Sequence, residues 1–139
     1  MSITTQLIKD EGKNVIAGRH IVYTCPALKL TVGYGRNLED RGLSEAEAMY
    51  LLSNDIEDCR EEVARTFPFF QHLTPARQDV LTMMCFNLGL NRLLGFKKMI
   101  RAIDDKDYRE ASVQMLDSDW AKQVGDRAIR LAKTMKEDI

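Results

Sequence analysis

Apolar residues recur at three- and four-residue steps over most of the chain after Gly42, which is the period of an amphipathic helix. The clearest run consists of Ala48, Leu52, Ile56, Cys59, Val63 and Phe67. Ser44 and Glu47 form a capping box ahead of this run, and Pro68 ends it. The pattern predicts a helix over 44–67, which at about 22 residues would span ~33 Å and could join two lobes.

The remaining helices are predicted from caps and from the same period. Thr74 with Pro75 is typical of an N-cap and a first-turn proline, and the apolar positions that follow run to Gly89. This segment is the most apolar of the predicted helices, so we expect it at the centre of the core. Further helices are expected at 95–104, at 107–116, where Asp107 and Glu110 form a capping box, and at 118–135. Residues 2–11 form a short amphipathic helix closed by Gly12.

The segment from His20 to Tyr34 has a different character, because β-branched and aromatic residues flank a Cys-Pro-Ala-Leu connection. It predicts a hairpin or a small meander. The expected fold class is therefore α+β, in a single domain over 1–139. We expect a small β-containing lobe at 13–43, the connecting helix at 44–67, and a helical lobe formed by 69–139 with the N-terminal helix. Ligands tend to bind in a cleft between unequal lobes.

Composition and charge narrow the class of protein. Of the 139 residues, 45% are hydrophobic and 29% are charged, and no apolar run reaches the ~18–20 residues that a membrane span needs. The 20 basic and 21 acidic residues provide no basic surface for nucleic acid. The N-terminus lacks the pattern of a secretory signal, so we expect synthesis and folding in the cytoplasm, with no stable membrane insertion.

Cys25, Cys59 and Cys85 are widely spaced and have no CxxC pairing. This argues against a disulfide framework and against a zinc site, and we expect free thiols, no metal and no cofactor. Cys59 and Cys85 fall on apolar helical faces and are interpreted as packing residues. Trp120 and the aromatic cluster at 67–70 are interpreted in the same way, because aromatic side chains dominate cores.

Three side chains of the N-terminal segment could carry chemistry. Glu11 lies where the first helix gives way to the strand region, and a partly desolvated carboxyl there could act as a general acid. Side chains alternate along a strand, so if the neighbours of Thr31 face the core of the small lobe, its hydroxyl faces the cleft and can hold a water. Cys25 is either a small packing residue or a nucleophile with His20 as its base.

An ordered set of motifs runs through the chain. It consists of Asp10-Glu11-Gly12, Tyr23-x-Cys25-Pro26-Ala27, Leu30-Thr31-Val32-Gly33-Tyr34-Gly35-Arg36-Asn37-Leu38, Phe86-Asn87-Leu88-Gly89, Gly95-Phe96, Trp120 and Arg127-Ala128. In this order and spacing the set resembles the phage-type lysozymes or endolysins, the family 24 glycoside hydrolases. The resemblance implies an α+β lysozyme fold and an enzyme that cleaves the β-1,4 bond between N-acetylmuramic acid and N-acetylglucosamine in peptidoglycan.

The resemblance also implies roles for individual residues. Glu11 falls on the acid that protonates the leaving oxygen, and Thr31 on the threonine that seats the attacking water. Cys25 occupies the position where the family usually has an aspartate, so the two-carboxylate scheme of glycosidases lacks its second member. Glu39 and Asp40 are interpreted as solvated residues of a polar turn. The residues expected to contact substrate are Asn37, Phe86, Asn87, Gln114 and Arg127, with Arg127 also approaching Glu11.

A second departure from the family is Arg36, where many relatives have a histidine that pairs with an acidic residue. Asp55 or Asp58, on the predicted connecting helix, could pair with Arg36 instead.

The leading hypothesis is a monomeric muramidase that acts by inversion on peptidoglycan glycan strands during phage release, exported by a separate holin-like pore protein. It would be made in the bacterial host cytoplasm and would act on the cell wall after release. Two alternatives stay open. One is a cysteine hydrolase that uses Cys25 and His20, and the other is a peptidoglycan-binding module without catalysis.

Overall fold

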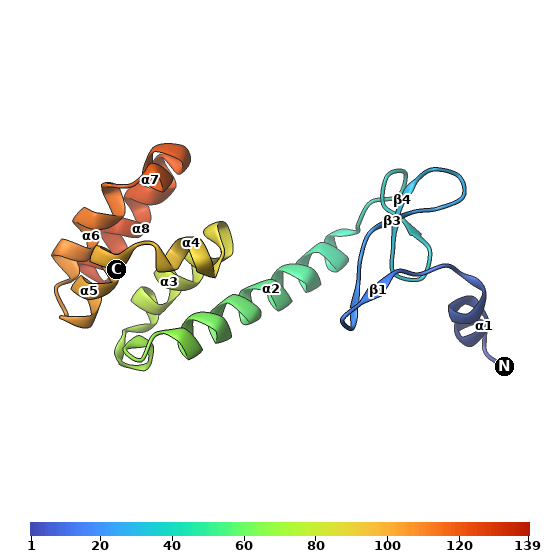
Figure 1. Ribbon diagram of the computed structural model, residues 1–139, viewed down its shortest axis with the longest axis horizontal. Helices are drawn as coiled ribbons and strands as arrows, with labels where there is room; N and C mark the ends of the chain where they lie inside the picture. The colour runs from blue at the N-terminus through green and yellow to red at the C-terminus, as the bar shows by residue number, and fades with distance from the viewer. The chain divides into compact units, whose positions relative to one another are not determined.

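A computed structural model describes all residues from 1 to 139, and the chain divides into two compact units, Met1–Tyr50 and Leu51–Ile139. The first unit holds helix α1, five short strands and the start of helix α2. The second holds the rest of α2, one 3-10 helix and six further α-helices (Figure 1).

Helix α1 (Ile3–Asp10) begins after Ser2, whose hydroxyl oxygen accepts a 3.1 Å hydrogen bond from the Thr5 amide. It ends at Glu11, whose backbone N–H donates to the Leu7 carbonyl at 2.8 Å. The predicted helix at 2–11 is therefore confirmed. Its three predicted apolar residues, Ile3, Leu7 and Ile8, are exposed in the structure.

The strands form two small antiparallel sheets. The bounds are β1 (Val15–Ile16), β2 (Arg19–His20), β3 (Tyr23–Thr24), β4 (Leu30–Val32) and β5 (Arg36–Asn37). β1 pairs with β2, and β3, β4 and β5 form a meander in which Thr31 lies opposite both Tyr23 and Asn37. The predicted meander is confirmed, although pairing begins earlier than expected, at Val15, and continues to Asn37.

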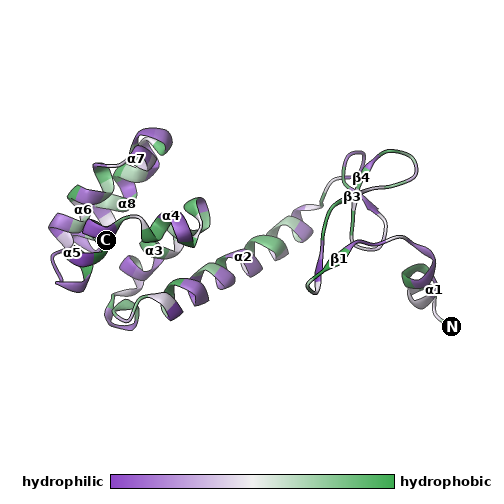
Figure 2. Ribbon diagram, in the orientation of Figure 1, coloured by the Kyte–Doolittle hydropathy of each residue, from purple (hydrophilic) through white to green (hydrophobic).

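Helix α2 (Glu45–Thr66) starts in the capping box that the sequence predicts. The Ser44 amide donates to Glu47 Oε1 at 2.8 Å, and the Glu47 amide donates to Ser44 Oγ at 3.2 Å. Hydrophobic and hydrophilic residues are interspersed along the whole helix (Figure 2). Its 22 residues match the predicted length, and the boundary between the two units falls within it.

The second unit contains the whole hydrophobic core. Its elements are η1 (Phe70–His72), α3 (Pro75–Leu88), α4 (Leu90–Leu94), α5 (Lys97–Asp104), α6 (Tyr108–Leu116), α7 (Asp119–Val124) and α8 (Asp126–Glu137). α6 packs against α5 and α8, and α3 packs against α8. Val80, Leu81 and Met84 of α3 have no exposed surface, which confirms that this helix lies in the core.

The predicted helix at 118–135 is wrong in one respect, because Gly125 divides it into α7 and α8. Gly125 has φ 58° and ψ −119°, a conformation open to glycine and strained for other residues. The short helix α4 was not expected. It lies between Gly89 and Gly95, which were interpreted only as the ends of neighbouring helices.

The C-terminal end of α8 is held by Arg77 of α3. Its Nε donates to the Met135 carbonyl at 2.7 Å and its Nη2 donates to the Lys136 carbonyl at 3.2 Å. The guanidinium lies 3.7 Å from the centre of the Tyr108 ring. Carbonyls at a helix end have no partner within the helix, so these bonds fix α8 against α3.

None of the helices combines the length and the apolar character that crossing a membrane requires.

Candidate active site

The carboxylate of Glu11 lies against the backbone of Gly35, in the connection between β4 and β5. A Cβ atom added at Gly35 would be 2.9 Å from Glu11 Oε2, closer than Cβ atoms approach other heavy atoms, and a tight 3.3 Å from Cδ. Gly35 also has φ +87°, so glycine is favoured there for two independent reasons. The exposed side chain of Glu11 is therefore placed beside the meander by the absence of a side chain at Gly35.

A second contact ties the end of α1 to the same sheet. The Tyr23 hydroxyl donates to the Gly12 carbonyl at 2.6 Å. Tyr23 lies opposite Thr31 in the β3–β4 pairing. The residue after Glu11 is thus bonded to the strand that neighbours Thr31.

Thr31 is the only buried residue of the first unit, with 2% of its surface exposed. Its Oγ1 donates to the Lys29 carbonyl at 2.9 Å, while its neighbour Leu30 is 47% exposed. The sequence placed Thr31 towards the cleft on the condition that Leu30 and Val32 face the core of the small lobe. That condition is not met, because Thr31 is buried and Leu30 is exposed. Alternation along a strand defines two faces without saying which is inside, and a bonded hydroxyl can be buried at little cost.

Cys25 lies next to Thr31, in the turn between β3 and β4. Its amide donates to the Lys29 carbonyl at 3.0 Å, and the Leu28 amide donates to the Cys25 carbonyl at 2.8 Å. A backbone hydrogen bond from Lys29, with a smaller one from the Thr31 hydroxyl, lowers the pKa of the Cys25 thiol. Burial of this half-buried cysteine acts in the opposite direction but is outweighed, so the turn makes its thiol easier to ionise than an isolated one.

His20 does not act on Cys25 in the structure. Its ring packs edge-on against Tyr34, with the ring centres 4.9 Å apart, and no hydrogen bond joins it to the thiol. The predicted Cys25–His20 pair is therefore not assembled.

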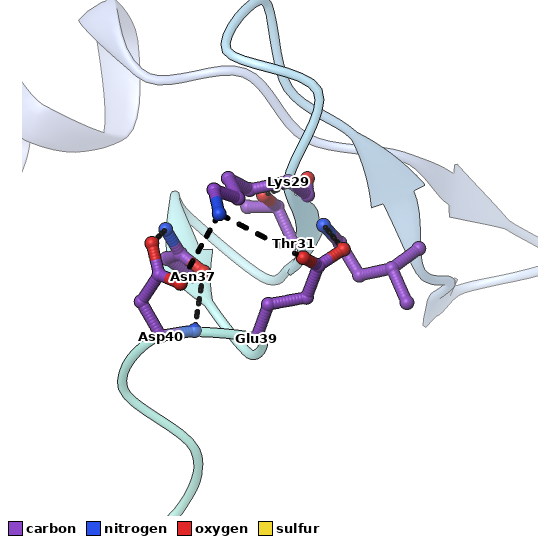
Figure 3. A network of polar contacts seen from close by, with 6 residues as sticks. Lys29, Thr31, Asn37, Glu39 and Asp40 are labelled. Atoms are coloured by element: carbon purple, nitrogen blue, oxygen red, sulfur yellow. Dashed lines mark hydrogen bonds and ion pairs between the residues drawn. The ribbon is translucent and has the colours of Figure 1, made fainter.

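Asn37, Glu39 and Asp40 belong to a polar network around Lys29 (Figure 3). Glu39 Oε1 accepts a 2.9 Å hydrogen bond from the Leu30 amide, and Asp40 accepts from Lys29 Nζ at 3.3 Å. The Asn37 side chain donates to Asp40 at 3.1 Å and accepts from the Asp40 amide at 3.0 Å. Glu39 and Asp40 are exposed, as expected, but they also brace the backbone that carries Thr31.

Arg36 pairs with Glu47, rather than with Asp55 or Asp58 as the sequence suggested. Arg36 Nη1 donates to Glu47 Oε1 at 2.8 Å and to the Gly42 carbonyl at 3.1 Å, and Nη2 bonds the second carboxylate oxygen. The Arg36 guanidinium lowers the pKa of Glu47 from 4.5 to about 2, with a further contribution from Ser44. Glu47 was the nearer acid in sequence, but it was assigned only to the capping box.

Three of the predicted substrate-binding residues line one cavity in the helical unit. Phe86, Asn87 and Arg127 are exposed to a space of about 710 Å³ between α2, α3 and α8. Arg127 forms no ion pair within the chain. Gln114 lines a separate cavity of about 540 Å³ and donates to Glu110 Oε1 at 2.7 Å. Arg127 and Glu11 belong to different units, so their expected approach stays a prediction.

Trp120 positions Asn87, a contact that sequence reasoning missed. Its indole Nε1 donates to Asn87 Oδ1 at 2.7 Å, and its ring packs edge-on against Phe96. Trp120 is 2% exposed, which confirms its interpretation as a packing residue. The two residues are 33 positions apart, so the sequence gives no local sign of the bond.

These elements define an α+β, lysozyme-like fold, with small antiparallel sheets and a helical unit that contains the core. The chain matches the family described as Phage lysozyme over residues 13–136, and it belongs to that family. The matched region begins two residues after Glu11. The position of Glu11 therefore rests on its contacts and on the resemblance in sequence.

Two curated relatives come from Dictyostelium discoideum. "Probable T4-type lysozyme 1" is 27% identical over 94 residues, which cover 67% of this chain and 55% of the relative. "Probable T4-type lysozyme 2" is 26% identical over 89 residues, which cover 63% of this chain and 52% of the relative. The alignments thus span about half the length of these relatives.

Proposed function

We propose that the protein is a muramidase that hydrolyses the β-1,4 bond between N-acetylmuramic acid and N-acetylglucosamine in bacterial peptidoglycan. Family membership supports a lysozyme activity in general. The observation that carries the proposal is the approach of Glu11 Oε2 to Gly35, because it places a carboxyl beside the sheet that holds Thr31 and Cys25.

In the proposed reaction Glu11 donates its proton to the glycosidic oxygen as the bond to the anomeric carbon breaks. A water held by Thr31 and Cys25 attacks the opposite face of the sugar, which gives inversion. The single hydrogen of the Thr31 hydroxyl goes to the Lys29 carbonyl, so its oxygen is free to accept from the water.

Cys25 supplies the base in this scheme. Its thiolate accepts the proton of the water and provides the negative charge that an aspartate would otherwise place near the oxocarbenium-like transition state. The hydrogen bond from Lys29 lowers the pKa of this thiol and so favours that role. When the thiolate forms, the Thr31 hydroxyl can donate to it instead of to Lys29.

The test is release of reducing ends from purified peptidoglycan. Glu11→Gln should lower the rate by roughly 100-fold or more, because general acid catalysis contributes that much. Glu61→Gln is the matched control, since Glu61 is exposed and forms no ion pair. Circular dichroism of both variants checks that they are folded. Wild-type activity in Glu11→Gln would exclude Glu11 as the acid.

Two substitutions at Cys25 separate the proposal from a cysteine hydrolase. Cys25→Ser should lower the rate by roughly 100-fold without abolishing it, because a hydroxyl still holds the water but cannot take its proton, and Cys25→Asp should be at least as active as wild type, because it restores a carboxylate. Complete loss of activity in Cys25→Ser, together with inactivity of Cys25→Asp, would favour a nucleophilic thiol. Binding of glycan strands without reducing-end release by the wild type would favour a non-catalytic module.

The proposal also covers the substrate, the oligomeric state and the route by which the protein reaches the cell wall. The substrate is the glycan strand of the bacterial cell wall, reached by a monomer made in the host cytoplasm and released through a separate pore protein. Sedimentation of the purified protein tests the monomer.

A further inference from the structure

Cys59 and Cys85, 26 residues apart in the sequence, belong to one side-chain cluster between α2 and α3. Cys85 of α3 is 3% exposed and belongs to the hydrophobic core. Cys59 of α2 is half-buried and packs against that core. Both residues lie in the unit Leu51–Ile139, and neither has a role in the proposed glycosidase reaction.

Glu62 locates the face of α2 that meets Cys85. Cys85 Sγ lies 3.9 Å from Glu62 Oε2. Cys59 precedes Glu62 by three residues, and side chains at this spacing are neighbours on one helix face. Each thiol also affects the pKa of the other, as expected for sulfur atoms that lie near one another. The cluster thus brings two sulfur atoms from different helices together.

We propose that Cys59 and Cys85 are a disulfide-forming pair, a modification site that links α2 to α3 when the protein meets a low-molecular-weight disulfide. The inference is independent of the glycosidase activity. It adds a reaction to the interpretation of the two cysteines as packing residues, which their place in and against the core confirms.

The reaction is thiol–disulfide exchange in two steps. The Cys59 thiolate attacks one sulfur of the small disulfide, whose S–S bond breaks and releases one small thiolate. The Cys85 thiolate then attacks Cys59 Sγ in the mixed disulfide and releases the second. The two protein thiols lose two electrons and two protons, and the small disulfide becomes two thiols. Cys59 reacts first because it is the more exposed sulfur.

The environment makes the second step slow. Burial, then the neighbouring Cys59 and Glu62, raise the pKa of the Cys85 thiol to about 12. Burial also raises the pKa of Cys59, with smaller contributions from Glu62, Asp55 and Asp58. Little thiolate is present at neutral pH, so the rate should rise with pH. Glu62→Gln should accelerate closure several-fold, because it removes a negative charge beside the attacking sulfur.

The experiment uses the full chain with Cys25→Ser, so that only the two cysteines of the cluster can react. The protein is incubated with oxidised glutathione at mildly alkaline pH, quenched by alkylation, digested without reduction and mapped by mass spectrometry. The expected product is a cross-linked pair of peptides that contain Cys59 and Cys85. A disulfide that closes a loop of this length should raise Tm by roughly 10 °C.

The same peptide mapping provides the controls and can contradict the proposal. Cys85→Ser should stop at the glutathione adduct of Cys59, which identifies the first step. The proposal is overturned if both cysteines of the parent protein are still free thiols at equilibrium, so that the quench alkylates both. It is also overturned if the glutathione adduct of Cys59 persists in folded protein that retains Cys85. An unchanged closure rate in Glu62→Gln would contradict the placement of Glu62 beside the attacking sulfur.

Discussion

At the scale of single residues, the three thiols differ because of what surrounds each sulfur. Cys25 lies in a turn where backbone N–H groups and a hydroxyl stabilise the negative charge. Cys85 lies in a core where burial and a carboxylate oppose that charge. One residue type therefore has a lowered thiol pKa in the first unit and a raised thiol pKa in the second.

The rates of alkylation should follow this difference. With iodoacetamide at neutral pH, Cys25 should be modified first, Cys59 next and Cys85 last, with Cys25 ahead of Cys85 by roughly tenfold or more. Mass spectrometry of tryptic peptides at successive times measures all three rates in one sample. Unfolding in guanidinium should make the three alkylation rates similar. An alkylation rate of Cys85 equal to that of Cys25 in the folded protein would contradict the assigned environments.

At this scale the sequence led to Glu11, Cys25 and Thr31 as predicted site residues, but it did not predict how their side chains are held. The motif contains Gly35, yet its closeness to the Glu11 carboxylate appears only in three dimensions. The side of the strand on which Thr31 lies could be given only conditionally, because alternation does not distinguish the covered face from the open one. The Lys29 carbonyl that accepts its hydrogen bond could not be read from residue types.

At the scale of elements, Glu47 has two functions. It closes the capping box at the start of α2, and it holds Arg36 of β5 through both carboxylate oxygens. The start of the helix and the last strand of the meander are thus fixed by one side chain.

This pairing predicts a pH dependence. The pKa of Glu47 is depressed to about 2 from 4.5, so its stabilising contribution is complete above 4.5 and is lost as the pH falls through about 2. NMR titration of the Glu47 carboxyl carbon measures the pKa directly. Arg36→Gln should raise it towards 4.5, while the Ser44 bonds keep part of the depression. A Glu47 pKa near 4.5 in the wild type would contradict the ion pair.

Local signals explain which elements were predictable. The caps of α2, α3 and α6 are formed by residues three positions apart, and all three were predicted. The break at Gly125 was missed because the apolar period continues across it, and a lone glycine within such a pattern is often tolerated. The pairing of Arg36 was missed because two acids on the predicted helix looked equally suitable.

At the scale of the whole molecule, hydrophobic burial is confined to one unit. Every buried apolar residue lies between Val63 and Met135, whereas the only buried residue of the first unit is Thr31. The first unit is therefore held by short sheets, caps and ion pairs.

Hydrogen exchange should reveal this asymmetry. Amides in β3 and β4 should exchange roughly 100-fold faster or more than those in α3, α6 and α8, because local opening there exposes little apolar surface. Mass spectrometry of peptic fragments after exchange measures both groups in the same sample. Equal protection of the meander and the helical core would contradict the prediction.

The change from strands to helices near Gly42 could be predicted, since all five strands precede it and α2 follows it. The grouping of the N-terminal helix with the helical lobe could not, since α1 belongs to the compact unit Met1–Tyr50. Contacts between distant positions could not be predicted. Helix packing brings Asn87 to Trp120 and Cys59 to Cys85. Periodicity shows which face of a helix is apolar, but not which helix that face packs against.

The hydrogen bond between Tyr23 and Gly12 has a consequence for how the chain can vary. The bond joins the two ends of the segment from Gly12 to Tyr23, which contains the β1–β2 hairpin. These ends stay together whatever the length of the chain between them. Loop-closure entropy grows only slowly with length, so residues can be inserted at the exposed tip around Gly18 at small thermodynamic cost. The count of residues between Glu11 and Cys25 is therefore a poor guide to their separation in space, and search patterns that fix this spacing would overlook chains built in the same way.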